Sequence, residues 1–293
     1  MMSAGVLPDS EIGTLAAAYF LLGLVFQPLQ ELSDLYSQVQ SATAAMVKVS
    51  AVLDTEADVR SPAAPRDPGT LRGEIEFDAV RFAYGRNEVL HGIDLTIPAG
   101  GCIALVGESG GGKSTMAKLV ARFYDPASGT VRVDGMDLRE LDLHAYRRQL
   151  GVVLQDPFLF SGTIADNIRF ARPGATDAQV AETAAMLGLD RLARRFPEAL
   201  DHPVREGGSG LSAGERQLIS IARALLADPR ILILDEATSN IDRPTELLIE
   251  RALDKLLHGR TSLIIAHRLS TVARADEVVT IDHGRIASRA AAA

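Results

Sequence analysis

The chain has 293 residues, with 30 Lys and Arg against 38 Asp and Glu, which gives a formal net charge of −8 at pH 7. Its composition, 47% hydrophobic and 23% charged, is that of a globular protein of one large or two modest domains, and it excludes a disordered or collagen-like chain. The acidic balance argues against a nucleic-acid partner, and the single cysteine, Cys102, excludes an internal disulfide.

The N-terminal segment is apolar. Residues 12–26, IGTLAAAYFLLGLVF, carry no charge, and beyond Pro28 apolar residues recur at helical spacing. We expect one long helix in residues 1–54, whose first half lies at lipid depth and whose second half extends into the cytoplasm. A buried helix of a soluble domain is the alternative, because the charge-free run is shorter than the about 20 apolar residues of a typical spanning helix.

The pattern changes after this segment. Residues 55–72 contain several prolines among charged residues, which predicts an extended linker. From Gly73 on, short strand patterns with one irregularity are followed by apolar strands that alternate with helical stretches, and this alternation predicts an α/β fold with a largely parallel sheet. Residues 158–228 lack strand patterns and are expected to be mostly helical. The alternating strands are expected at 103–106, 130–133, 152–154, 231–234, 263–265 and 278–281.

A glycine-rich loop carries the strongest chemical signal. Residues 107–115, GESGGGKST, follow the apolar strand CIALV and precede a helical run, so they match the phosphate-loop pattern G-x-x-x-x-G-K-[ST] in its required context. Glycines let backbone N–H groups turn inward around phosphate oxygens, and the helix N-terminus adds positive potential. Lys113 can reach the β- and γ-phosphates, and the Ser114 hydroxyl can ligate Mg²⁺. The predicted phosphate-binding residues are Gly107, Glu108, Ser109, Gly110, Gly111, Gly112, Lys113, Ser114 and Thr115.

The same loop also satisfies G-x-S-x-G, the nucleophile turn of α/β-hydrolases. Ser109, Asp235 and His267 even follow one another in the chain order of that triad. This alternative is disfavoured because it leaves Lys113 and Ser114 without a role and needs no second acid after Asp235.

A second motif places two acids after an aliphatic strand, in the sequence ILILDE. A buried parallel strand delivers the residues that follow it to the carboxyl edge of the sheet, where ligands bind. We expect Asp235 to hold Mg²⁺ through its water shell, and Glu236 to orient or deprotonate an attacking water. Two solvated acids at a strand end are the alternative interpretation.

A third motif, LSAGE at residues 211–215, opens a helical run. Ser212 and Glu215 form the S-x-x-E capping box, in which each side chain satisfies the backbone N–H of the other. A well-capped structural helix explains this pattern fully, and a helix N-terminus that also presents N–H groups to a phosphate explains it equally well. The local sequence leaves both interpretations open.

The order of the motifs makes a family resemblance specific. The phosphate loop is followed by Gln155 after a short strand, by LSAGE, by ILILDE, by Asp242 in SNID and by His267 in AHR. This order resembles the nucleotide-binding domain of ATP-binding cassette (ABC) transporters, and together with the apolar front it resembles the C-terminal part of an exporter subunit from Ile12 to Arg285. The resemblance implies an α/β P-loop NTPase core with a mainly parallel sheet, an antiparallel β subdomain and a helical subdomain, preceded by a long, partly transmembrane helix.

The resemblance also implies a division of the chain and an activity. Residues 1–54 would be the remnant of a transmembrane domain, 55–72 a linker, and 73–293 the nucleotide-binding domain with its helical subdomain at about 158–228. The domain would bind ATP and Mg²⁺ and hydrolyse ATP to energise export, on the cytoplasmic side of the cytoplasmic membrane. Its partners would be a transmembrane domain and a second ABC subunit, with which it would form a head-to-tail dimer.

The resemblance assigns roles to individual residues. Tyr84 would stack on adenine, Gln155 would sense Mg²⁺ and the lytic water, and His267 would contact the γ-phosphate. Tyr84 as a half-buried strand aromatic and His267 as a core histidine are the plain alternatives. Phe158 and Phe160 would face the membrane helices or be ordinary core residues. The residues that would complete the partner's ATP site are Leu211, Ser212, Ala213, Gly214 and Glu215, with Asp242 at the dimer seam.

The chain departs from the family pattern at three places: in the signature, at the front, and at the tail, where ASRAAAA follows Arg285 in place of the usual trailing helix. Ala213 replaces a glycine and Glu215 a glutamine in the signature, which would suit one half of an asymmetric heterodimer whose hydrolytic site is formed by this chain's own loop; a homodimer stays open. One membrane helix stands where an exporter subunit has several, and we hypothesise a truncated gene product or a misassigned start. The alternative functions are a non-transporting ATP-binding protein and a soluble cassette ATPase, the second of which the exporter-like front argues against.

Overall fold

The computed structural model describes residues 9–196, 198–235, 241–266 and 268–292, and its contacts divide the chain after Asp58 into two units. The first unit contains one helix, α1 (Asp9–Leu53), which continues through Pro28. The stretch Gly13–Leu53 is long and apolar enough to cross a membrane by length and composition, and none of its apolar window is buried. The predicted long apolar helix is confirmed, and the alternative of a helix buried in this chain's own core is wrong.

The second unit, which begins at Val59, is built around a six-stranded sheet in the order β12–β11–β3–β10–β9–β6. Neighbouring strands from β11 to β6 are parallel, and β12 pairs antiparallel with β11. The predicted mainly parallel sheet is therefore confirmed. Its strands are β3 (Cys102–Val106), β6 (Leu150–Val153), β9 (Ile231–Asp235), β10 (Thr261–Ile265), β11 (Glu277–Asp282) and β12 (Arg285–Ala291).

A four-stranded antiparallel sheet in the order β2–β1–β4–β5 forms the predicted β subdomain. One irregularity is predicted here, and the pairing of β1 with β2 shows three register shifts, between Phe77 and Val80, between Val80 and Arg81, and between Phe82 and Ala83. The strand expected at 130–133 belongs here, so its placement in the parallel layer is wrong. It alternates buried and partly exposed residues, as an antiparallel strand with one covered face does. The strands are β1 (Ile75–Tyr84), β2 (Asn87–Ile97), β4 (Ser128–Val133) and β5 (Met136–Asp137).

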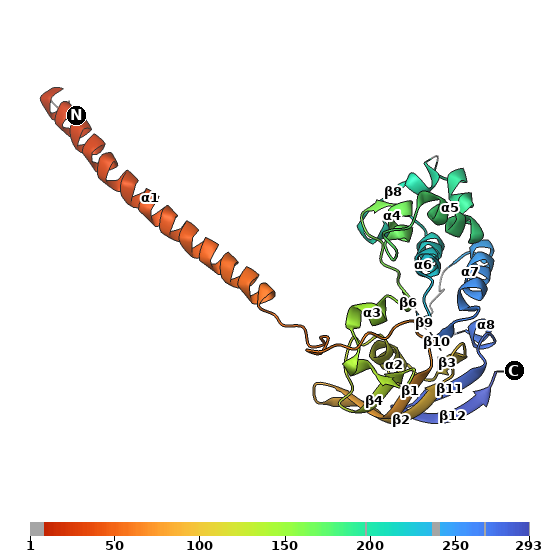
Figure 1. The fold of residues 1–293 in the computed structure, drawn as a ribbon. Coiled ribbons are helices and arrows are strands. Elements are labelled where there is room, and N and C mark those ends of the chain that lie inside the picture. The colour runs from red at the N-terminus through yellow and green to blue at the C-terminus, as the bar shows by residue number, and fades with distance from the viewer. Residues whose placement is uncertain (1–8, 197, 236–240, 267, 293) are drawn as a thin grey trace, which may run out of the picture. The chain divides into compact units, whose positions relative to one another are not determined.

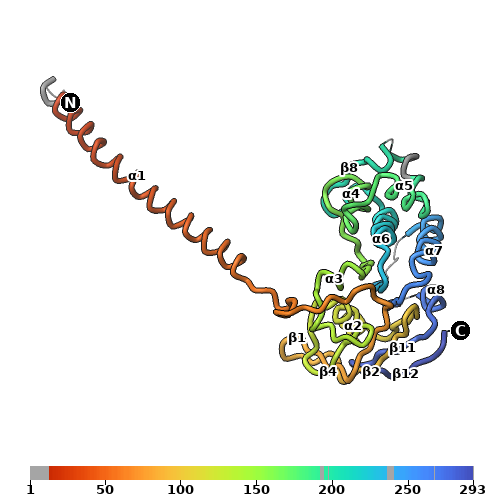
Figure 2. Tube along the Cα trace, in the orientation of Figure 1, coloured from red at the N-terminus to blue at the C-terminus, as the bar shows by residue number. Residues whose placement is uncertain are grey.

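Helices fill the region expected at 158–228, and the helical subdomain lies at the opposite end of the second unit from strands β1, β2 and β4 (Figures 1 and 2). Its helices are α4 (Ile164–Arg169), α5 (Asp177–Met186) and α6 (Ala213–Ala227), with 3-10 turns at Leu189–Arg194, Ala199–Asp201 and Glu206–Gly208. A small ribbon of β7 (Gly162–Thr163) and β8 (Pro203–Val204) also lies here. Strands of two residues have no readable periodicity, so the sequence could not predict them.

The remaining helices cover the central sheet. They are α2 (Lys113–Val120), α3 (Leu143–Arg147), α7 (Arg243–Leu257) and α8 (Leu269–Val272), with a 3-10 turn at Leu138–Glu140. Ile231 and Ile233 of β9 pack in one core with α2 and the antiparallel sheet, whereas Leu232 and Leu234 pack in a second core with α6 and α7. Burial of both faces explains why these strands read as continuous aliphatic runs.

Candidate functional site

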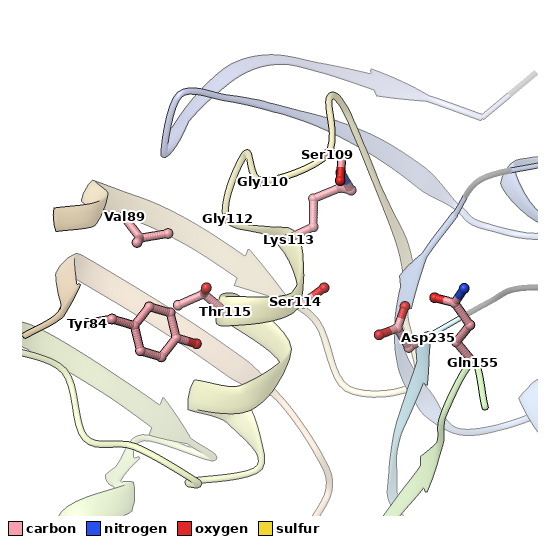
Figure 3. A pocket seen from close by; sticks show the side chains of 10 residues that line it. All are labelled: Tyr84, Val89, Ser109, Gly110, Gly112, Lys113, Ser114, Thr115, Gln155 and Asp235. Carbon is pink, nitrogen blue, oxygen red and sulfur yellow. The ribbon is translucent and has the colours of Figure 1, made fainter. Parts of the chain in front are cut away.

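A pocket of about 630 Å³ opens at the carboxyl edge of the central sheet. It is formed by the loop between β3 and α2, by the ends of β1 and β9, by the start of β2 and by the loop after β6 (Figure 3). Ligands of parallel α/β sheets bind at this edge. The lining residues are Tyr84, Val89, Ser109, Gly110, Gly112, Lys113, Ser114, Thr115, Gln155 and Asp235.

The loop from Gly107 to Gly112 has a backbone that only glycine accommodates at its two ends. Gly107 has φ +135°, and a Cβ placed on it would collide with the carbonyl oxygen of Ile281. Gly112 has φ +109°, and a Cβ there would lie 2.7 Å from Cδ2 of Leu90. Both positions therefore combine a left-handed backbone with close neighbours, so glycine is required.

Replacing Gly107 with alanine is expected to lower the free energy of unfolding by about 2–5 kcal/mol, because backbone strain and overpacking add. Gly110→Ala is the matched control: Gly110 has φ +83° but no atom within 4 Å of an added Cβ, so it should cost about 1 kcal/mol. Thermal unfolding of the two variants measures the difference. Equal destabilisation would contradict the close approach of Ile281.

The side chain of Lys113, the first residue of α2, reaches into this loop. Its side chain is buried, and Nζ donates hydrogen bonds to the carbonyl oxygens of Gly107 at 2.8 Å and Glu108 at 2.7 Å. Burial lowers the pKa of Lys113, and the carboxylate of Asp235 opposes that effect. The ammonium group is thus held at the concave side of the loop, where an anionic ligand would offset its desolvation.

The N-terminus of α2 is open to an anion. Its N-cap residue is Gly112, and no side chain caps it. The first N–H groups of a helix lack intrahelical partners, and the helix dipole favours negative charge at that end. A phosphate chain therefore fits the cradle formed by the loop, the helix end and Lys113.

Three of the oxygen-bearing side chains that line the pocket suit a metal ion. Ser114 begins α2, Asp235 ends β9, and Gln155 follows β6, which is the parallel neighbour of β9 (Figure 3). Hydroxyl, carboxylate and carboxamide oxygens are hard ligands that suit Mg²⁺, which normally completes its shell with substrate phosphates and water. The described residues contain no group of three or more His, Cys, Asp or Glu that could hold a metal ion alone. A magnesium ion therefore fits together with a phosphate ligand.

Tyr84 stands at the rim of the pocket with 37% of its surface exposed. Its ring packs edge-on against Tyr124 at 5.3 Å and Phe82 at 4.8 Å between centroids. Lys118 Nζ lies 3.5 Å from the Tyr84 hydroxyl. The ring is held in place yet accessible, as a stacking partner for a flat ligand must be. Val89 of β2 also lines the pocket; a single aliphatic in an alternating strand gives no signal by which the sequence could reveal it.

The signature residues lie outside this pocket, at the start of α6. Ser212 Oγ accepts the Glu215 N–H at 3.2 Å, and Glu215 Oε2 accepts the Ser212 N–H at 2.6 Å, which confirms the predicted capping box. A Cβ on Gly214 would collide with the side chain of Thr245 in the first turn of α7. Asp242 caps that helix, and its hydrogen bonds with Thr245 lower the pKa of the Asp242 carboxyl. The N-termini of α6 and α7 therefore adjoin.

Two predicted catalytic residues, Glu236 and His267, lie outside the described residues. Phe158 and Phe160 are 47% and 40% exposed, so their interpretation as ordinary core is wrong. The Phe160 ring stacks on that of Phe170 at 4.3 Å, and the Phe158 ring packs edge-on against Phe160. The three rings form an exposed aromatic cluster on the helical subdomain.

Comparison with known proteins places this site in a family. The family model described as ABC transporter matches residues 90–239. The chain is 45% identical over 275 residues to an uncharacterized ABC transporter ATP-binding protein of Bacillus subtilis (strain 168), a match that covers 94% of this chain and 46% of the relative. It is also 45% identical over 287 residues to a multidrug efflux ATP-binding/permease protein of Mycobacterium tuberculosis (strain ATCC 25618 / H37Rv), covering 97% of this chain and 24% of the relative.

The fold is similar to that of a solved bacterial Atm1-family ABC exporter with ATP bound. The two share 37% sequence identity at a TM-score of 0.78, over 99% of this chain and 50% of the exporter chain. The chain thus spans half or less of the length of these proteins. The phosphate loop, Gln155, the signature and Asp235 all fall within the matched residues 90–239, and the chain belongs to the ABC transporter family.

Proposed function

We propose that the chain binds and hydrolyses ATP in the pocket beside the phosphate loop and thereby energises export as part of an ABC transporter. The observation that carries the proposal is the cradle itself: an uncapped helix N-terminus and a buried lysine, in one pocket with the carboxylate of Asp235 at the end of β9. The hydrolase triad is disfavoured, because Lys113 and the open helix end have no role in it.

Most of the pocket residues then have a role. The loop residues 107–112 and Lys113 hold the phosphate chain, and Tyr84 packs on the adenine ring. Ser114, Asp235 and Gln155 would hold Mg²⁺, which would neutralise charge on the phosphates when bound. Glu236 would orient or deprotonate the attacking water, and His267 would contact the γ-phosphate, as the family resemblance implies.

Replacing Tyr84 with alanine is expected to weaken ATP binding by about 5- to 150-fold, the scale of losing one base–aromatic stack. Tyr84→Phe keeps the ring and should bind ATP nearly as the wild type does. The affinity for inorganic tripolyphosphate, which has no base, should be the same in all three proteins. Titration of a fluorescent ATP analogue, with unlabelled ATP and tripolyphosphate as competitors, measures these affinities. A parallel loss of tripolyphosphate affinity in Tyr84→Ala would contradict the stacking role.

The membrane role rests on α1 and on the exposed aromatic cluster of the helical subdomain. The apolar stretch of α1 would lose contact with water by entering lipid, and we place the second unit on the cytoplasmic side. Phe158, Phe160 and Phe170 supply the apolar surface that a membrane domain would cover. Partition of the full chain between detergent and aqueous phases tests the first of these assignments.

The dimer role rests on the signature. In a head-to-tail dimer, Ser212 and Gly214 would complete the partner's ATP site, with Asp242 at the seam. Ala213 adds a methyl group where a phosphate would approach, whereas the carboxylate of Glu215 is paired with Arg195 at 2.7 Å. The added methyl group weakens the contribution to the partner's site while leaving this chain's own loop intact, which favours a heterodimer.

The ATPase activity of the full chain in detergent, measured with and without a candidate partner subunit, tests this function. We expect ATP turnover that the partner subunit increases and that is absent in the Lys113→Met variant. ATP binding without turnover in either mixture would support the alternative of an ATP-binding protein that does not transport.

A further inference from the structure

The segment between α1 and the antiparallel sheet is fastened to the second unit, and we call its residues 59–72 the strap. At its beginning, the carbonyl oxygen of Arg60 accepts a hydrogen bond from Arg122 Nη2 at 3.0 Å. The hydroxyl of Ser61 accepts the Leu143 N–H at 3.0 Å. Further on, Arg66 forms a parallel β-bridge with Leu141. These contacts are specific, unlike those of a flexible linker.

The end of the strap is held by the carboxamide of Gln149 and by the carboxylate of Asp134, whose Oδ2 accepts the Arg72 N–H at 2.7 Å. Gln149 Oε1 accepts the N–H of Leu71 at 2.9 Å, and Gln149 Nε2 donates to the carbonyl oxygen of Gly69 at 2.6 Å. Leu71 is 2% exposed and belongs to the core that contains α2. Gln149 directly precedes β6, the strand that leads to Gln155 in the pocket.

Arg122 occupies an unusual backbone position. It follows the last residues of α2 with φ 49°, the left-handed conformation in which helices commonly place glycine. Its side chain is only 4% exposed. Besides Arg60, the guanidinium contacts Asp125 at 3.0 Å and the carbonyl oxygens of Leu141 and Arg139 at 3.4 Å. Arginine at this position carries backbone strain that glycine would avoid. In return, its guanidinium contacts several segments of the chain.

The strap contact lies at one end of the helix whose other end faces the pocket. Helix α2 has eight residues and begins at Lys113 and Ser114, so its length is about 12 Å. The Tyr146 hydroxyl donates to the Val120 carbonyl oxygen at 2.6 Å, which fixes the same helix end independently of the strap. A shift of this end reaches the phosphate cradle through a short, rigid element.

We propose that Arg122 is a positioning residue through which the docked strap sets the placement of α2, so that strap docking and nucleotide binding stabilise each other. The proposal rests on the proposed function in that a nucleotide binds the pocket. Because α1 ends at Leu53, shortly before the strap, movement of α1 reaches the phosphate loop along the chain itself. Coupling of this kind is reciprocal: the factor by which ATP favours the docked strap equals the factor by which the docked strap favours ATP.

The Arg122→Gly variant of the full chain in detergent tests the proposal. Glycine relieves the left-handed strain, so the variant should fold, but it removes every guanidinium contact. Hydrogen exchange measured by mass spectrometry reports the opening of residues 60–72, and titration with a fluorescent ATP analogue reports affinity. We expect faster exchange of the strap and an affinity about 5- to 50-fold lower. In the wild type, ATP should slow exchange of the strap by a similar factor.

Three variants serve as controls. Tyr146→Phe disturbs the same end of α2 without touching the strap, Ser61→Ala loosens the strap without touching α2, and Arg122→Lys keeps the charge but not the planar fork. Ser61→Ala should lower ATP affinity in proportion to its effect on strap exchange. Arg122→Lys should resemble Arg122→Gly in both measurements.

Four outcomes would overturn the proposal. If Arg122→Gly speeds exchange of the strap but ATP affinity stays at the wild-type value, the strap is a structural contact that is not coupled to nucleotide binding. If Tyr146→Phe lowers ATP affinity as much as Arg122→Gly does while the strap stays protected from exchange, the loss of affinity comes from damage to the end of α2 and not from the strap. A wild-type chain that binds no ATP would defeat the proposed function and the coupling together, whereas ATP binding without an effect on the strap defeats the coupling alone.

Discussion

Replacing Glu236 with glutamine is expected to lower ATP turnover by about 10²- to 10⁴-fold, the usual effect of losing a positioned general base. Glutamine has nearly the same size and keeps one oxygen, so the change removes the basic carboxylate and little else. Glu236 follows Asp235, which ends β9 and lines the pocket. ATP binding should remain, because the phosphate cradle is formed by the loop residues and by Lys113.

Steady-state phosphate release and ATP titration of the same preparation measure these two effects. Glu182→Gln makes the same chemical change on an exposed residue of α5 and should leave both quantities unchanged. Turnover of Glu236→Gln within a few-fold of wild type, in an assembly that hydrolyses ATP, would exclude Glu236 as the base.

Replacing Lys113 with methionine is expected to weaken ATP binding by about 10- to 1,000-fold and to abolish measurable turnover, because charge-assisted hydrogen bonds to phosphates are strong in a buried site. The fold should survive the substitution. Methionine fills a similar volume, and removing a buried ammonium group also removes its desolvation cost, which offsets the lost hydrogen bonds to Gly107 and Glu108.

Isothermal titration with ATP and thermal unfolding separate affinity from stability. Lys255→Met is the matched control, because Lys255 is exposed on α7 and donates its hydrogen bond to the Met186 carbonyl oxygen, outside the pocket. Wild-type affinity in Lys113→Met would show that the loop does not bind the phosphates.

The sequence predicts those parts of the site that lie in continuous motifs. The strand, loop and helix around Lys113 are found as expected, because glycine spacing and a buried strand impose that geometry locally. Gln155 and Asp235 meet in one pocket because β6 and β9 are parallel neighbours, which the topology of an α/β sheet makes predictable. At these positions the sequence motif is enough to predict where the residue lies in the fold.

The parts that the sequence does not predict depend on contacts between distant segments. Val89 reaches the pocket only because the antiparallel sheet packs beside the loop. Residues 55–72 are predicted to form an extended linker, and their prolines and charges do not indicate that Arg122 and Gln149 bind the backbone of the strap. The strand at 128–133 shows its partner only when β1 is placed beside it.

ATP titration of the wild-type chain with and without Mg²⁺ tests the proposed nucleotide site most directly. We expect one ATP bound per chain, tighter binding with Mg²⁺ than without it, and displacement by ADP. A folded wild-type chain that binds no ATP under these conditions would contradict the proposed site.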